Sequence, residues 1–141
     1  MYRTLTTIMS AALVATGAGC ASVAETSRTG GIQEVRLAER LTPTDVQVQS
    51  GDEIRWINER SSPVTIEFLE GALGDVSCER GFSTRTFRNV MGQRREVATI
   101  EPLGSASLCF TTSGTVSYNA RMESPIAGGQ VINAGTIIVG Q

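Results

Sequence analysis

The sequence predicts an all-β protein, a β-sandwich of seven to eight strands. Short segments with apolar residues at every second position recur along the chain, which is typical of half-buried strands. Turn sequences such as Gly51-Asp52, Ser61-Ser62-Pro63 and Thr112-Ser113-Gly114 separate these segments. Glycine is abundant, with 15 residues, and no long segment has helical periodicity. Many short strands divided by regular turns favour a sandwich over a helical fold.

The stretch 45–58, DVQVQSGDEIRWIN, is the clearest of these segments. Valines alternate with polar residues in its first half, and Ile54 and Trp56 do so after the Gly51-Asp52 turn. We interpret it as one β-hairpin, with Trp56 in the core. The other strands are expected at residues 32–37, 64–68, 97–100, 105–110, 115–121 and 136–139.

Residues 69–95 lack this alternation and are expected to form one long excursion from the sandwich. Loops of this length inside a compact domain are usually functional or mobile. Its arginines have no acidic residue between them, and they are Arg80, Arg85, Arg88, Arg94 and Arg95. Guanidinium groups suit phosphates and carboxylates, so these residues are candidates for contact with an anionic lipid or an acidic envelope protein. Alternatively, they pair with the acids of the chain itself.

The first 20 residues are typical of an export signal. Arg3 provides a positive end, and residues 5–18 are mostly apolar but too few to span a bilayer. The segment ends in GAGC, and small residues before Cys20 resemble a bacterial lipoprotein processing site, although Gly17 replaces the usual leucine-like residue. We expect Cys20 to be lipidated and residues 21–31 to form a flexible tether to a domain at 32–141. Ordinary cleavage nearby would instead leave a soluble periplasmic protein.

The charge and residue types exclude several functions. The formal net charge is −2, which gives no basic field for nucleic acid. The chain has no histidine, so it cannot build a Ser-His-Asp or Cys-His catalytic device or a histidine-ligated metal site. We therefore expect a protein that is not an enzyme.

Two cysteines remain if Cys20 carries lipid. An exported pair in an oxidising compartment is first interpreted as a disulfide, here between Cys78 and Cys109. Such a bridge would hold the excursion against the sandwich. A redox-active or metal-binding pair is the alternative.

The order of the segments resembles that of the cupredoxins, the blue-copper proteins. Three blocks carry the resemblance, and they are DVQVQSGDEIRWIN, IEPLGSASLCF and SGTVSYNARMESPIAGGQVINAGTIIVG. They resemble the second and third strands of the family, its proline-glycine turn, and its last hairpin with the ligand loop. The resemblance covers residues 32–141 and implies a Greek-key β-sandwich.

The resemblance also implies where copper ligands would stand, and none of them is present. The two histidine positions correspond to Val64 and Glu123, and the cysteine position corresponds to Ala120. A type 1 copper site needs two imidazoles and a thiolate. Met122 is the soft side chain left in this loop, and a single thioether does not hold copper. We expect no metal and no other cofactor.

Three further interpretations concern individual polar and aromatic residues. Tyr118 is expected to pack beneath the last loop with its hydroxyl hydrogen-bonded. Glu67 and Glu70 are interpreted as part of a solvated face and not as a catalytic pair. Asn119, Arg121 and Glu123 are hypothesised to form a salt-bridged plug where the family holds its metal.

These observations predict an exported, envelope-anchored binding or structural module without a type 1 copper site, placed on the periplasmic face of the outer membrane. The alternative is a copper-binding or electron-transfer protein that uses ligands from a partner.

Overall fold

The computed structural model describes residues 30–69, 76–126 and 128–141, and only the backbone of residues 87–90, 93 and 94. The expected signal segment with Cys20, most of the tether, and Glu70 lie outside the described residues. Within these ranges, no helix has the length and apolar character needed to cross a bilayer.

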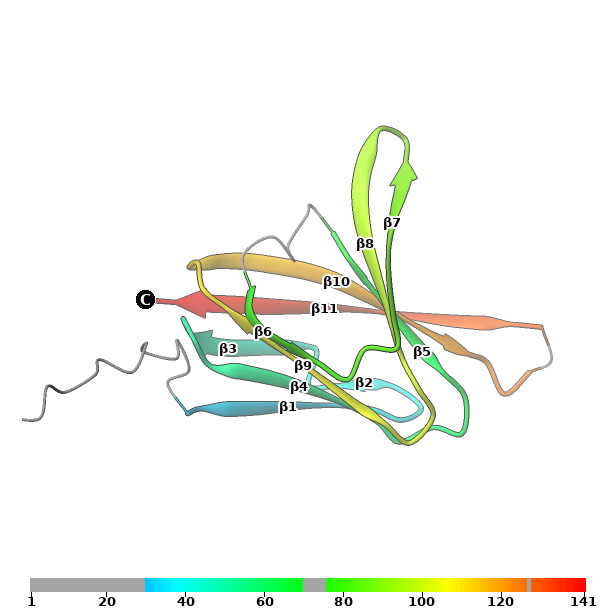
Figure 1. Ribbon diagram of the computed structural model, residues 1–141. Coiled ribbons are helices and arrows are strands. Elements are labelled where there is room, and N and C mark those ends of the chain that lie inside the picture. The colour runs from blue at the N-terminus through cyan, green and yellow to red at the C-terminus, as the bar shows by residue number, and fades with distance from the viewer. Residues whose placement is uncertain (1–29, 70–75, 127) are drawn as a thin grey trace, which may run out of the picture.

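Two β-sheets pack face to face, as the sequence predicts (Figure 1). The five-stranded sheet has the order β2-β1-β4-β9-β6 and consists of β2 (Leu41–Thr42), β1 (Ile32–Leu37), β4 (Glu53–Asn58), β9 (Ser105–Phe110) and β6 (Val76–Arg80). The six-stranded sheet has the order β3-β11-β10-β5-β8-β7 and consists of β3 (Asp45–Gln49), β11 (Gln130–Gly140), β10 (Gly114–Glu123), β5 (Val64–Phe68), β8 (Gln93–Ile100) and β7 (Thr84–Val90). The pairs β1–β4 and β3–β11 are parallel, so both sheets are mixed.

The predicted 45–58 hairpin is wrong, although its strands and its turn are present. β3 pairs with β11 in one sheet, whereas β4 pairs with β1 and β9 in the other. The Gly51-Asp52 turn, with Gly51 at φ 91°, therefore crosses between sheets. Alternation reports that one face of each strand is buried, and it does so equally for a hairpin and for two strands facing each other across a core.

The predicted strand number is too low, because the excursion at 69–95 holds β6, β7 and the start of β8, and because the short β2 was not expected. β8 pairs with β5 only from Glu96 to Ile100, so the rest of the β7–β8 hairpin extends beyond the body of the sandwich (Figure 1). Such a hairpin does not need an apolar face, which explains why alternation is missing there. Met91 and Gly92, both with positive φ, form its two-residue turn.

The core is built around Trp56, which is fully buried, as predicted. From β4 its ring crosses to the opposite sheet, where it meets Phe68 of β5 and Tyr118 of β10 edge-on, with ring centroids 5.9 and 5.6 Å apart. Phe82 packs on it at 6.2 Å. Edge-on aromatic pairs add specific stabilisation beyond the area they bury.

Tyr118 lies over Gly135, its partner across the β10–β11 pair. Burial raises the pKa of Tyr118 to about 12, and the nearby Trp56 indole opposes part of that rise. The indole Nε1 of Trp56 is the donor near this hydroxyl, but the pair does not meet strict hydrogen-bond geometry in the described part of the chain.

The predicted disulfide between Cys78 and Cys109 is confirmed, with the two Cα atoms 5.0 Å apart. The cysteines are direct partners in the β6–β9 pair. β6 is an edge strand with no other neighbour in its sheet, so the bridge secures it to the sandwich.

Replacing both cysteines by serine (Cys78→Ser with Cys109→Ser) should lower the free energy of unfolding. Removing a crosslink between residues 31 apart costs about 3–4 kcal/mol in the chain-entropy model. Urea denaturation of the variant and the parent measures this. Equal stability, or two reactive thiols in the denatured, unreduced parent at these positions, would contradict the structural role.

Gly135→Ala should destabilise the domain by about 1–3 kcal/mol, because it overpacks the core. A Cβ at this position would lie 2.6 Å from the Tyr118 hydroxyl oxygen and 2.7 Å from a ring carbon. Gly140→Ala in the same strand is the matched control, since its Cβ would meet only Val48 O at 3.6 Å. Thermal unfolding of both variants checks the difference, and similar melting temperatures would refute it.

Candidate functional site

Two of the three positions that correspond to copper ligands lie inside the sandwich. Val64 begins β5 and Ala120 lies in the neighbouring β10, and both are fully buried. Glu123 ends β10, and it is exposed to solvent. Thr65 pairs with Arg121, which puts Val64 and Glu123 at the same end of the sandwich as Ala120.

The donors at this end do not fit a type 1 copper site. Val64 and Ala120 offer hydrocarbon only, and the Met122 thioether is the soft donor buried beside them. No group of three His, Cys, Asp or Glu side chains able to hold a metal occurs among the described residues. Blue-copper geometry needs imidazole and thiolate ligands, so the scaffold here lacks the chemistry.

The hypothesised plug of Asn119, Arg121 and Glu123 is wrong. Arg121 hydrogen-bonds to Glu67 on the outer face of the six-stranded sheet, at 2.8 Å from Nε and 2.7 Å from Nη2. Residues one apart on a strand point to opposite faces, so Arg121 and Glu123 point away from buried Ala120 and Met122. A plug would require these side chains to face inward.

A cleft of about 740 Å³ opens at the same end of the molecule, among the β1–β2, β4–β5 and β10–β11 loops. These loops lie on the right of Figure 1. Its lining residues are Ala38, Glu39, Arg40, Glu59, Arg60, Ser61, Ser62, Pro125, Val131 and Asn133. Val131 and Asn133 pair with Met122 and Ala120, respectively, across the β10–β11 hairpin. The cleft therefore adjoins the place where the ligand positions lie.

Asn58 holds the loops beside this cleft together. Its side chain is buried, and its Nδ2 group donates to the carbonyl oxygens of Ser62 and Glu101 at 2.9 Å each and to that of Ile100 at 3.3 Å. Its Oδ1 accepts from the backbone N–H of Arg60 at 3.0 Å. One side chain thus ties the β4–β5 loop to the end of β8.

Arg60 joins two further loops at the cleft wall. Its Nη1 donates to the carbonyl oxygen of Ala38 at 2.7 Å, and its Nη2 donates to that of Glu123. Its Nε is buried and has no hydrogen-bond partner among the described residues. No carboxylate of the described residues lies within ion-pair distance of this guanidinium.

Glu67 is buried and not solvated, which overturns the sequence-based interpretation of this residue. Only 1% of it is exposed, between Arg121 and Arg95, whose Nη1 lies 3.1 Å from its Oε1. Burial by itself raises the pKa of Glu67, but hydrogen bonds and charges from the two arginines outweigh it and lower the pKa below its ordinary value. This carboxylate stays ionised, so it is unsuited to act as a general acid.

The five arginines of the excursion differ in their surroundings. Arg85 pairs with Glu79 at 2.9 Å and Glu96 at 3.6 Å, and Arg95 pairs with Glu67, so both engage acids of the chain itself. Arg80 is exposed on β6. Arg88 and Arg94 lie on the facing strands of the β7–β8 hairpin, and their side chains are outside the described part of the structure.

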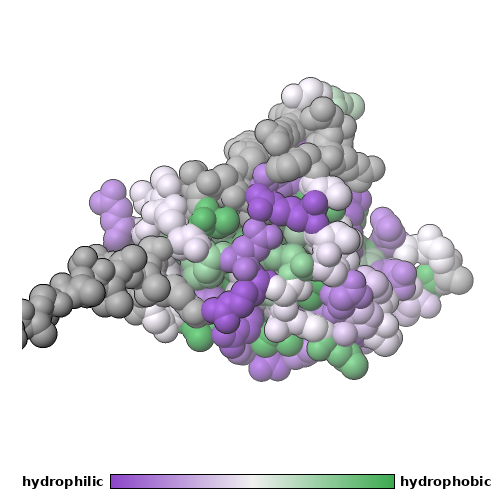
Figure 2. Space-filling model, viewed as in Figure 1, coloured by the Kyte–Doolittle hydropathy of each residue, from purple (hydrophilic) through white to green (hydrophobic). Residues whose placement is uncertain are grey.

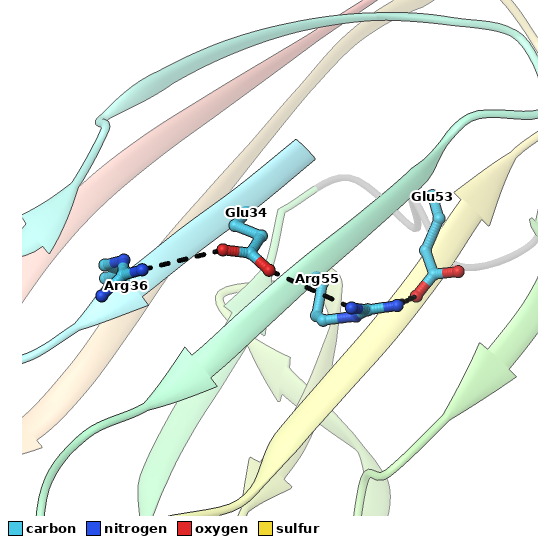
Figure 3. A network of polar contacts seen from close by, with 4 residues as sticks. All are labelled: Glu34, Arg36, Glu53 and Arg55. Carbon is cyan, nitrogen blue, oxygen red and sulfur yellow. Dashed lines mark hydrogen bonds and ion pairs between the residues drawn. The ribbon is translucent and has the colours of Figure 1, made fainter. Parts of the chain in front are cut away.

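The five-stranded sheet carries a second polar network on its outer face (Figure 3). Arg55 joins Glu53 at 2.8 Å and Glu34 at 4.0 Å, and Glu34 lies 3.8 Å from Arg36. Figure 2 shows hydrophilic residues as a band across the face in view, with hydrophobic residues in separate patches. Charges of both signs alternate along this network, which leaves little net field to attract an ionic ligand.

The sequence interpretation missed the cleft and its residues Arg60 and Asn133. These residues come from loops and strand ends that only tertiary packing brings together. In the sequence, Asn58 was the one residue near the cleft that a local pattern indicated, because it follows the aromatic strand and is part of the family resemblance.

Glu67→Gln should lower the free energy of unfolding at neutral pH by about 1–3 kcal/mol, because it leaves two partly buried guanidinium groups without their counter-charge. The folded-state pKa is lowered, so the contribution is complete above the ordinary value of 4.5 and declines as the pH falls below it toward the folded pKa. Denaturant unfolding from pH 7 to acid checks this.

Glu79→Gln is the matched control for that variant. Its side chain is 31% exposed in a pair with Arg85, so its loss should cost less than about 1 kcal/mol. Equal effects of the two substitutions, or a difference between parent and Glu67→Gln that does not shrink in acid, would argue against this account.

Comparison with known proteins gives matches to solved structures alone. No protein-family model matches the chain, and a search of curated proteins finds no match. A reduced Cu(I) form of an amicyanin mutant, solved at pH 4, aligns with a TM-score of 0.52 and 22% identity over 85% of this chain and 88% of the amicyanin. A second reduced amicyanin mutant aligns with a TM-score of 0.51 and 21% identity over the same shares. Amicyanin is a cupredoxin. At these identities the likeness establishes the fold alone, and the chain has the cupredoxin-like β-sandwich fold.

Proposed function

We propose that this chain is an exported, envelope-anchored binding or structural module of cupredoxin-like fold that works without a type 1 copper site and is not an enzyme. The observation that carries the proposal concerns the end of the sandwich where the copper-ligand positions lie. There, buried Val64 and Ala120 offer only hydrocarbon in place of an imidazole and a thiolate. A cupredoxin-like scaffold without these donors cannot perform blue-copper electron transfer.

Three features support export and anchoring. Residues 1–20 have the positive end, apolar run and small-residue cysteine site of a lipoprotein signal. The Cys78–Cys109 disulfide is a bond that persists in oxidising compartments such as the bacterial periplasm. The segment 21–31, rich in small and polar residues, is suited to separate a domain from a membrane surface.

Partner contact is supported by the shape and charge of the β7–β8 hairpin. The hairpin projects from the sandwich (Figure 1), and its turn residue Met91 is almost fully exposed. Arg88 and Arg94 lie on its two strands, and Arg80 lies on β6. We assign the contact with an envelope protein or an anionic lipid surface to these three arginines, since Arg85 and Arg95 already pair with acids of the chain.

The test compares the full-length protein with Cys20→Ser in a bacterial host. The parent should fractionate with outer membranes and the variant with soluble periplasmic proteins, because serine has no thiol to carry the lipid whose buried hydrocarbon anchors the parent. Purified protein should also show no intense blue band and no stoichiometric binding when Cu(I) or Cu(II) is added.

Met122→Leu is the control for the copper measurement, because it removes the buried thioether at that end. Its response to copper should equal that of the parent. Soluble parent protein would contradict the anchoring. A blue band, or tight binding abolished by Met122→Leu, would instead favour the copper-binding alternative.

A further inference from the structure

The end-of-sandwich cleft holds two arginines that lack a carboxylate partner. Arg40 and Arg60 both line it, and neither forms an ion pair with any carboxylate in the described ranges. This contrasts with Arg85, Arg95 and Arg121, which each engage a glutamate. The volume of about 740 Å³ lies within the range of small-molecule sites.

Arg60 is held in place before any ligand arrives. Its two Nη groups are fixed by the carbonyl oxygens of Ala38, in the β1–β2 loop, and Glu123, at the end of β10. Carbonyl dipoles satisfy hydrogen bonds but leave the formal charge without a counter-ion. A partly desolvated guanidinium in this state gains stabilisation from an anion, and its fixed geometry reduces the entropy cost of binding one.

Two buried donors without a partner belong to residues that line the cleft. The Nε of Arg60 and the Nδ2 of Asn133 are buried, line the cleft through their residues, and lack a hydrogen-bond partner among the described groups. Buried donors without a partner are uncommon in native structures and call for a bound water or ligand. Ser61 and Ser62 add hydroxyls to the same wall. The deficit is therefore one of acceptors.

The rest of the lining restricts the type of anion. Glu39 and Glu59 also line the cleft, and their negative charges disfavour a dianion such as phosphate. Ala38, Pro125 and Val131 supply apolar surface. A single negative charge on a hydrocarbon body satisfies both conditions, and a carboxylate matches the planar fork of a guanidinium.

We infer that this cleft binds a small organic monocarboxylate, with the carboxylate received by Arg40, Arg60 and Asn133 and the hydrocarbon portion lying against Ala38, Pro125 and Val131. This deepens the binding part of the proposed function. It does not depend on the lipid anchor or on the absence of copper, because neither Cys20 nor Met122 lines the cleft.

The experiment follows backbone amide resonances of the isotope-labelled protein by NMR during titration with three matched probes. These are 4-methylpentanoate, 3-methylbutylamine and inorganic phosphate. The carboxylate should shift resonances of Ser61, Ser62, Val131 and Asn133 in a saturable manner with millimolar affinity. The amine should produce no saturable shift, and phosphate should bind more weakly than the carboxylate.

Two substitutions test the residues without breaking the loop contacts of Arg60. Arg40 is exposed, and Asn133 Nδ2 has no partner to lose. Arg40→Gln and Asn133→Leu should each weaken binding of 4-methylpentanoate by about tenfold, as expected for a lost hydrogen bond to a charged group. Arg80→Gln, an exposed arginine on the opposite edge of the five-stranded sheet, is the control and should bind as the parent does.

Three results would overturn the inference. They are no saturable shift with the carboxylate up to tens of millimolar, stronger binding of the amine or of phosphate than of the carboxylate, or unchanged affinity in both Arg40→Gln and Asn133→Leu. None of these results bears on membrane fractionation or on the copper measurement.

Discussion

The packing of Trp56 between the two sheets is the interaction on which the rest of the structure depends. The indole comes from the five-stranded sheet and contacts Phe68 and Tyr118 of the six-stranded sheet edge-on. Gly135 makes this possible, because the Tyr118 ring occupies the space that a side chain would need there. An aromatic cluster shared by both sheets sets their spacing and makes each sheet depend on the other for burial.

At the end of the sandwich where cupredoxins hold copper, side-chain hydrogen bonds join the loops. Asn58 links the β4–β5 loop to the end of β8, and Arg60 links the β1–β2 loop to the end of β10. Both side chains bond to backbone carbonyls, so they order these loops while leaving a guanidinium charge without a carboxylate. The same contacts that stabilise the end of the fold thus create the electrostatic character of the cleft.

Each outer face carries a glutamate that is buried and paired with arginine. On the five-stranded sheet, buried Glu53 pairs with Arg55, and Glu34 and Arg36 continue the network toward the surface (Figure 3). On the six-stranded sheet, Glu67 is buried between Arg95 and Arg121. These arginines have carboxylate partners within the chain, whereas Arg40 and Arg60 have none among the described residues. Net charge alone could not reveal this difference.

The sequence by itself determined the all-β class, the position of Trp56 in the core, the disulfide pair and the absence of histidine, because alternation, cysteine number and residue type are local properties. Only the tertiary structure decided that β3 and β4 belong to different sheets, that β6, β7 and the start of β8 lie within residues 76–95, and that Glu67 is buried. It also decided that Arg60 and Asn133 share one cleft. These facts depend on contacts between residues distant in the chain. Alternation of apolar residues shows which face of a strand is buried, but it does not show which strand lies opposite.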